Sequence, residues 1–196
     1  MTAALKQARD RQTATIVTLT TDRLLLRPFR ATDIDDYARM CADPEVMRYL
    51  GEGRPLSRGD AWRQMAMLVG HWHLKGYGMW AIEERDGGRL IGRIGCHYPE
   101  GWPGFEVGWA LARECWGRGY ALEGARAALD HAFTALAQEH VISLIHPANE
   151  RSIRLAERLG ERAEGTAEVH GQPVLVYGIH RDGWRAVPRA RERSDP

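Results

Sequence analysis

The sequence predicts one domain of the α/β (α+β) class: a mixed, mostly antiparallel central sheet of about seven strands with helices on both faces. Three observations support this. Strand-like and helix-like segments alternate along most of the 196 residues. Residues 86–88 form a glycine-rich hairpin turn signal, and residues 119–137 carry apolar side chains at helical spacing. We place the domain at residues 15–184, between flexible tails at 1–14 and 185–196, the second rich in arginine.

The N-terminal third is predicted to contain an extended segment followed by three helices. We expect extended chain over residues 15–29, a helix over 33–42 and a short helix over 44–50. Ser57 and Asp60 form a capping signal that begins a longer helix. From three- and four-residue spacing, the inward face of that helix is predicted to be Trp62, Met65, Ala66, Val69 and Trp72.

The rest of the domain is predicted to alternate strands with two helices. The strands are expected near 79–84, 89–97, 104–111, 140–146, 162–169 and 173–180. The helices are expected over 119–137 and 150–159, and Gly160 stands at a C-cap position after the second. This order predicts a mixed sheet.

Charge and composition exclude several classes of protein. Lys plus Arg total 27 and Asp plus Glu total 26, so a net charge of +1 disfavours a globally basic nucleic-acid binder. All basic residues except Lys6 and Lys75 are arginine. Codon usage explains most of this excess. The family resemblance given below implies an exception for Arg113, Arg118, Arg151 and Arg154, which it places near an anionic ligand.

Nothing in the sequence points to a membrane, a disulfide framework or a metal. Cysteines 41, 96 and 115 are odd in number and widely spaced, as in a reducing compartment. The chain has no secretory signal, and its apolar runs fall short of the roughly 18 residues that a membrane span needs. His71 and His73 stand two apart in a predicted helix, and so on different faces. We therefore expect a cytoplasmic protein without a metal site.

The segment Trp116-Gly117-Arg118-Gly119-Tyr120-Ala121 has the chemistry of a phosphate-binding loop. It lies between a predicted strand and the strongest predicted helix. Glycines let backbone N–H groups turn toward an anion, and a helix N-terminus adds partial positive charge. Leu122 stands where a dinucleotide fingerprint needs a third glycine, and no Gly-Lys-Ser/Thr of a Walker loop follows.

Three longer runs carry a family resemblance: Phe105-Glu-Val-Gly-Trp-Ala-Leu, Glu114-Cys-Trp-Gly-Arg-Gly-Tyr-Ala-Leu-Glu-Gly-Ala and His146-Pro-Ala-Asn-Glu-Arg-Ser-Ile-Arg-Leu-Ala-Glu-Arg-Leu-Gly. Over about residues 20–180 the sequence resembles the GCN5-related N-acetyltransferases (GNAT), in particular the ribosomal-protein alanine N-acetyltransferases. The resemblance implies a GNAT fold, and acetyl-CoA held between two parallel strands that diverge.

The resemblance also implies which residues contact acetyl-CoA. The pyrophosphate would meet the amides of Trp116, Gly117, Arg118, Gly119, Tyr120 and Ala121. The pantetheine arm would pair with backbone groups of Trp109, Ala110 and Leu111. Asn149 and Ser152 match the Asn-x-x-Ser of the family, which reaches the pantetheine or the thiol. From the residue type alone, Asn149 is equally an N-cap.

Glu106 is the candidate general base. On a strand it shares a face with Gly108 and Ala110, while Phe105 and Val107 face the other way. An amine must lose a proton before it attacks a thioester, and a carboxylate suits that task directly or through water. A structural carboxylate paired with an arginine is the alternative.

Three positions depart from the family pattern. Trp116 replaces a common Gln or Arg, and Ala156 stands where many members carry a tyrosine general acid. Ser152 is then the candidate partner of the leaving thiolate. Glu161 replaces an aromatic residue after Leu-Gly, near the expected acceptor site.

The predicted function is an acetyl-CoA-dependent N-acetyltransferase that uses a ternary complex and no metal, acting as a monomer or homodimer. The expected acceptor is a protein N-terminal α-amine. The alternatives are a small amine such as an aminoglycoside or polyamine, and a non-catalytic CoA-binding module. Trp80 and Trp102 are candidate acceptor-cleft residues. An acidic rim is expected from Asp33, Asp35, Asp36, Asp43 and Glu45.

Overall fold

A computed structural model describes residues 16–186 of the chain. The predicted N-terminal tail at 1–14 and most of the predicted C-terminal tail lie outside these residues. Arg185 and Ala186 belong to a short last helix, α7 (Arg181–Ala186), rather than to a tail. Trp184 in this helix is buried, and its indole N–H donates to Asp130 Oδ1 at 2.9 Å.

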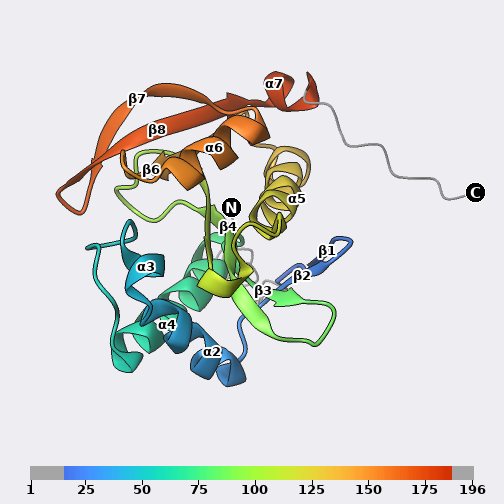
Figure 1. The fold of residues 1–196 in the computed structure, drawn as a ribbon. Helices are drawn as coiled ribbons and strands as arrows, with labels where there is room; N and C mark the ends of the chain where they lie inside the picture. Colours follow the sequence, from blue (N-terminus) through green and yellow to red (C-terminus); the bar gives the residue numbers. More distant parts are fainter. Residues whose placement is uncertain (1–15, 187–196) are drawn as a thin grey trace, which may run out of the picture.

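The described residues contain one eight-stranded mixed sheet, which confirms the predicted fold class (Figure 1). The strand order is β1-β2-β3-β4-β5-β6-β8-β7, and every neighbouring pair is antiparallel except β5 with β6. The strand bounds are β1 Leu19–Thr20, β2 Leu24–Arg27, β3 Met79–Glu84, β4 Leu90–His97, β5 Glu106–Leu111, β6 His140–Ile145, β7 Arg162–Val169 and β8 Gln172–His180.

The extra strand relative to the prediction comes from residues 15–29. This segment folds back on itself, because Thr21 accepts the Leu24 amide on Oγ1 and donates its own amide to the Leu24 carbonyl. β1 and β2 therefore form an antiparallel pair instead of one extended run.

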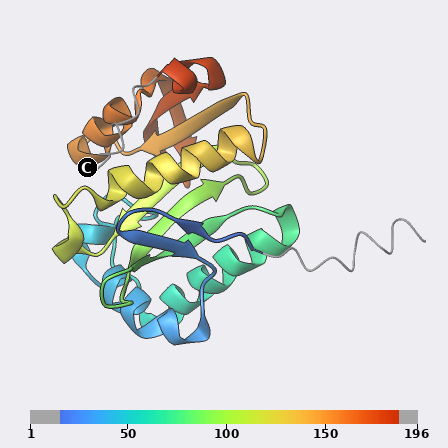
Figure 2. The same cartoon turned by 90° about the vertical axis from the view of Figure 1, so that its right-hand side faces the viewer.

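Helices cover both faces of the sheet, as predicted (Figures 1 and 2). On one face, α5 (Tyr120–Thr134) packs its alanines, Leu129 and Phe133 against the central strands, and α6 (Glu150–Leu159) lies beside β6 and β8. On the other face lie α2 (Ile34–Cys41), α3 (Pro44–Met47) and α4 (Arg58–Lys75). Two 3₁₀ turns, η1 (Ala31–Asp33) and η2 (Arg113–Cys115), complete the list.

The predicted inward face of α4 is correct for Met65 and Trp72 but wrong for Trp62 and Ala66. Trp62 is 56% exposed and Ala66 is exposed. The buried residues are Ala61, Met65, Leu68, His71 and Trp72. Apolar side chains stand all around this helix, so their spacing alone selects no single stripe. None of the helices in the described residues combines the length and the apolar character that crossing a membrane requires.

The parallel neighbours β5 and β6 separate after a single backbone pairing. Glu106 is paired with Ile142, whose amide donates to the Phe105 carbonyl at 2.9 Å. By comparison, β6 and β8 are paired from His140–His180 to Ile145–Leu175. Past Ile142, therefore, backbone groups of β5 and β6 are available to something other than each other.

Candidate active site

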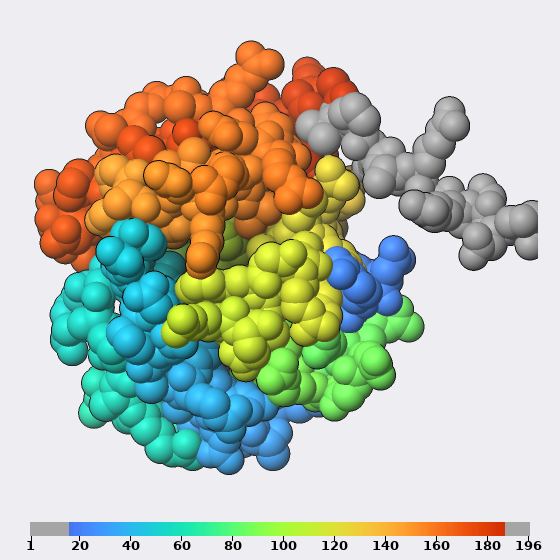
Figure 3. Space-filling view, in the orientation of Figure 1, coloured from blue at the N-terminus to red at the C-terminus, as the bar shows by residue number. Residues whose placement is uncertain are grey.

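Two connected cavities open where β5 and β6 separate. The larger has a volume of about 970 Å³ and runs from the 116–122 loop along α6. The smaller has a volume of about 300 Å³ and contains Glu106. The two share six lining residues: Arg48, Tyr49, Leu50, Trp109, Asn149 and Ser152. Figure 3 shows the yellow-green loop before α5 lying between the blue α2–α3 region and the orange α6 region.

The loop before α5 has the backbone that an anion site requires. Gly117 and Gly119 have φ angles of 73° and 81°, a left-handed conformation that favours glycine. Gly119 caps α5 without any side-chain hydrogen bond, so the first amides of the helix stay available to a ligand. A Cβ on residue 117 would meet nothing within 4 Å, so the loop surface there is open. These residues fit a pyrophosphate.

The arginines around the loop are not all the expected ones. The Arg118 side chain is outside the larger cavity, stacked over Tyr120 at 4.9 Å and 3.5 Å from Glu84. Arg113 also lies outside the cavity. The arginines that line it are Arg48, Arg151, Arg154 and Arg158, and the Arg151 guanidinium stacks over Trp116 at 4.6 Å.

Trp109, Asn149 and Ser152 meet at the junction of the two cavities. The Asn149 side chain accepts the Ser152 amide at 3.2 Å, so it is an N-cap of α6 as well as a lining residue of both cavities. The Trp109 indole donates to Ser152 Oγ at 3.2 Å. Because this oxygen accepts there, the serine hydroxyl hydrogen can point elsewhere.

Glu106 lies in the smaller cavity with its carboxyl group almost entirely buried. The Trp102 indole donates to Oε2 at 2.7 Å, and the Leu144 amide donates to the carboxylate from β6. Burial raises the pKa of Glu106 to about 7, while these two donors act against the rise. The alternation predicted for this strand is confirmed, since Val107 is in the core beneath α5 and Ala110 in the other core.

A second buried carboxyl group stands behind the first. Glu161 is 2% exposed; one oxygen lies 3.1 Å from Ser143 Oγ, and the other has no partner in the described chain. The Ser143 hydroxyl is also 2.9 Å from the Val107 carbonyl on β5. Burial, with the nearby charge of Glu106, raises the pKa of Glu161 to about 8. In its neutral form Glu161 can donate to Ser143, which then donates to Val107 and bridges the separated strands.

Sequence reasoning did not identify Ser143 or His97 as site residues. Ser143 is the one polar side chain within the buried part of β6, and that was the available signal. His97 pairs with Glu106 across β4 and β5 and lines the smaller cavity. Burial lowers the pKa of His97 to about 3, so the ring is neutral at physiological pH.

The expected acidic rim is wrong. Asp33 is buried against Arg27 at 2.7 Å, Asp35 pairs with Arg58 and Asp36 pairs with Arg39. Asp43 caps α3 by accepting the Glu45 amide. Of the five, only Glu45 lines a cavity, and that is the larger one.

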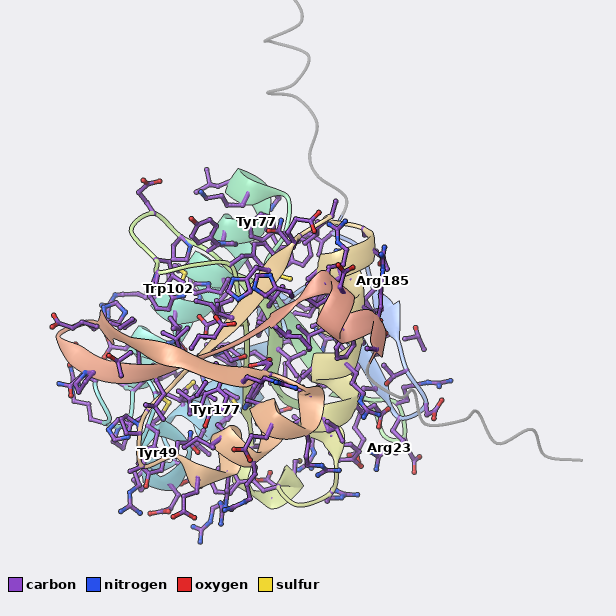
Figure 4. The ribbon with its side chains drawn as sticks, turned by 90° about the horizontal axis from the view of Figure 1, so that it is seen from above. Arg23, Tyr49, Tyr77, Trp102, Tyr177 and Arg185 are labelled. Atoms are coloured by element: carbon purple, nitrogen blue, oxygen red, sulfur yellow. The ribbon has the colours of Figure 1, made fainter. Side chains whose placement is uncertain are left out.

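Aromatic residues form the outer wall of the smaller cavity. Trp102 lines it as expected, but Trp80 is fully buried in the core, where its indole donates to the Val17 carbonyl. Tyr49 stacks on His146 with ring centroids 5.0 Å apart, next to the junction. In Figure 4, Tyr49 and Trp102 lie on the left of the molecule, away from Arg23 and Arg185.

Comparisons with known proteins show the family to which the chain belongs. Residues 23–162 match the model of the acetyltransferase (GNAT) domain. The chain belongs to the GNAT family of acetyltransferases. It is 30% identical over 166 residues to a Bacillus licheniformis protein described as the uncharacterized N-acetyltransferase p20, covering 82% of this chain and 93% of that one.

Solved structures share the fold of this acetyltransferase. An acetyltransferase from Agrobacterium tumefaciens is 34% identical, with a TM-score of 0.76 over 85% of this chain and 95% of that one. The ribosomal-protein-S5-alanine acetyltransferase from Vibrio fischeri has a TM-score of 0.67 over 86% of this chain and 98% of that one, at 17% identity. The chain is thus an acetyl-CoA-dependent acetyltransferase.

Proposed function

We propose that this acetyltransferase transfers the acetyl group of acetyl-CoA to a protein N-terminal α-amine by direct attack in a ternary complex. The observation that carries the proposal is the buried Glu106 carboxyl group, in a small cavity that joins the larger groove at Trp109, Asn149 and Ser152. The acceptor amine would enter the small cavity, while the larger groove would hold the cosubstrate.

The acidity of Glu106 favours an α-amine over a lysine side chain. Its pKa of about 7 lies roughly one unit below that of a free α-ammonium group, so taking that proton costs about 1.4 kcal/mol. A lysine ammonium lies more than about 3 units above Glu106, a cost of over ~4 kcal/mol. Glu106 would therefore deprotonate an α-ammonium readily and an alkylammonium poorly.

The remaining residues of the two cavities would bind acetyl-CoA and orient it for the reaction. The amides that follow Gly119, with Arg151, Arg154 and Arg158, fit the phosphates. Backbone groups of Trp109, Ala110 and Leu111 remain the proposed partners of the pantetheine arm, and Asn149 lies beside it. Ser152 would donate its hydroxyl hydrogen to the departing thiolate, because Ala156 is fully buried in the core and supplies no acid.

The reaction balances without a further reactant. The amine nitrogen forms a bond to the acetyl carbonyl carbon, the carbon–sulfur bond breaks, and the thiol leaves. Glu106 takes one proton from the ammonium group before the attack. The nitrogen loses a second proton as the amide forms, and this proton would pass through the Ser152 hydroxyl to the sulfur, so that the thiol leaves and Ser152 ends unchanged. A backbone N–H of β5 would hydrogen-bond the carbonyl oxygen as it gains negative charge. The Vibrio fischeri protein is named for the alanine of ribosomal protein S5. Because it is only 17% identical to this chain, the similarity concerns the fold alone. The proposal for the acceptor therefore rests on the cavity.

A peptide panel tests the proposal by thiol release. Each peptide is offered with a free α-amine and a blocked lysine, and again with a blocked α-amine and a free lysine. We expect turnover of the first form and little of the second. Turnover of polyamines or aminoglycosides with none of any peptide would instead support the second candidate, a small-molecule amine, for which a cavity of about 300 Å³ is large enough.

A further inference from the structure

Two histidines and a glutamate meet on the sheet away from both cavities. His140 begins β6 and His180 ends β8, and the two residues are directly paired across the antiparallel strands. Their rings stack with centroids 4.4 Å apart. Glu164 approaches from β7, with its carboxylate oxygens 3.0 and 3.1 Å from His140 Nε2. Three adjacent strands thus contribute one side chain each.

The backbone around Glu164 is shaped to bring its carboxylate to the histidines. The pairing of β7 with β8 is irregular between Ala163 and Gly165, so Glu164 occupies a bulge, a feature that redirects side chains. From there it crosses β8 directly over Gly178. A Cβ on residue 178 would lie 2.3 Å from a Glu164 carboxylate oxygen, so any other residue there would displace it. The bulge on β7 and the glycine on β8 together allow the Glu164 side chain to lie across β8.

We propose that His140, Glu164 and His180 form a binding site for a divalent transition-metal ion, with zinc as the best match. One ligand atom from each residue lies within 4.8 Å of the other two. Two imidazoles and a carboxylate are a common zinc ligand set, with bonds of about 2.0–2.2 Å. To form them, the two stacked rings would turn so that one nitrogen of each points at the ion. Imidazole ligands also suit copper and nickel, whereas calcium and magnesium prefer oxygen alone.

The ion would act on stability rather than on acetyl transfer, with water in its fourth position. His140, Glu164 and His180 line neither cavity. An ion there would connect β7, which is the last strand at one edge of the sheet, to β8 and β6. A ligand that binds only the folded chain raises its stability, so zinc should raise the melting temperature and leave turnover unchanged. The inference is independent of which amine is acetylated.

Zinc titration of untagged, chelator-treated protein tests this directly. We expect one zinc ion per chain by calorimetry, a micromolar or tighter Kd, and a rise in melting temperature. Cobalt should give the visible absorption of a site with histidine ligands. His180→Gln and Glu164→Gln, both at exposed positions, should each weaken zinc binding at least about tenfold. His73→Gln, at the exposed end of α4, is the matched control and should bind zinc normally.

Either of two results would overturn the metal site. One is zinc binding only in the millimolar range, which would leave a hydrogen-bonded imidazole–carboxylate pair as the role of the cluster. The other is unchanged zinc affinity in His180→Gln and Glu164→Gln, which would place the ion elsewhere. Circular dichroism and thiol release by both variants without zinc show that they are folded, so a loss of binding is attributable to the missing ligand.

Discussion

The two cavities that meet at Trp109 are made of different chemical groups. The larger presents helix N-terminal amides after Gly119 and exposed arginines such as Arg151. The smaller presents buried, titratable side chains, with Glu106 at its centre and Glu161 behind it. Binding by backbone amides depends on the conformation of the loop. Catalysis by side chains depends on each chemical group and its pKa. Substitutions should therefore affect the two cavities differently.

The largest expected effect concerns Glu106. Glu106→Gln keeps the shape and the Trp102 hydrogen bond but removes the base, so kcat/KM should fall by roughly 10²–10⁴-fold. The affinity for acetyl-CoA should not change, because the larger groove is intact. Glu114→Gln, at an exposed glutamate outside both cavities, is the control. Loss of acetyl-CoA affinity in Glu106→Gln would show that the two cavities do not act separately.

Glu161 should make stability depend on pH. Folding raises the pKa of Glu161 from 4.5 to about 8, so between these values the folded chain holds a proton that the unfolded chain releases. The free energy of unfolding should therefore fall as pH rises from about 5 to 8, by about 1.4 kcal/mol per pKa unit of the shift.

Glu161→Gln should remove much of that fall, leaving the smaller part due to Glu106. Urea unfolding at a series of pH values measures it, with the exposed Glu157→Gln as control. A wild-type stability that is constant or rising over this range would contradict a protonated Glu161.

The conformation of the loop before α5 is tested at Gly117. Gly117→Ala forces a side chain into a left-handed backbone at a cost of about 1–2 kcal/mol, and a loop that shifts to relieve it should bind acetyl-CoA roughly 5–30-fold more weakly. Gly70→Ala in α4, where nothing obstructs the added methyl group, should instead gain up to ~1 kcal/mol. Calorimetry and thermal unfolding measure both. Unchanged acetyl-CoA affinity in Gly117→Ala would argue against a phosphate role for this loop.

The smallest effect is expected at the arginines. Arg151 is exposed, so Arg151→Gln should weaken acetyl-CoA binding only a few-fold, and less at high salt. Arg39→Gln, at an exposed arginine outside both cavities, should have no effect on binding. Equal losses at low and high salt would show that Arg151 acts through its stacking on Trp116 rather than through its charge.

The difference between the two cavities also decided what the sequence could predict. The turn at 116–121 could be predicted because glycines at a strand–helix junction indicate a particular backbone conformation. The role of Asn149 as an N-cap could be predicted from its residue type. The face of the strand on which Glu106 lies could be predicted from the alternation of side chains along a strand. The Glu161–Ser143–Val107 contact joins segments far apart in the chain, and no local pattern encodes it.

The direction in which a side chain points was the second feature that the sequence could not predict. Arg118 stands inside the glycine loop, yet its side chain turns outward to Tyr120 and Glu84. The acidic residues of the first helices are held by Arg27, Arg39 and Arg58 instead of facing an acceptor. On α4, apolar residues on every side made the buried face ambiguous. Each of these outcomes depends on partners that only the folded chain supplies.

The dependence of kcat/KM on pH, measured with a free-α-amine peptide for wild type and Glu106→Gln, tests the central claim most directly. For the wild type we predict an acidic limb with an apparent pKa near 7, where Glu106 ionises. For Glu106→Gln, we predict a lower profile whose acidic limb lies about one unit higher, at the pKa of the peptide's own α-amine. The same acidic limb in both proteins would contradict Glu106 as the base.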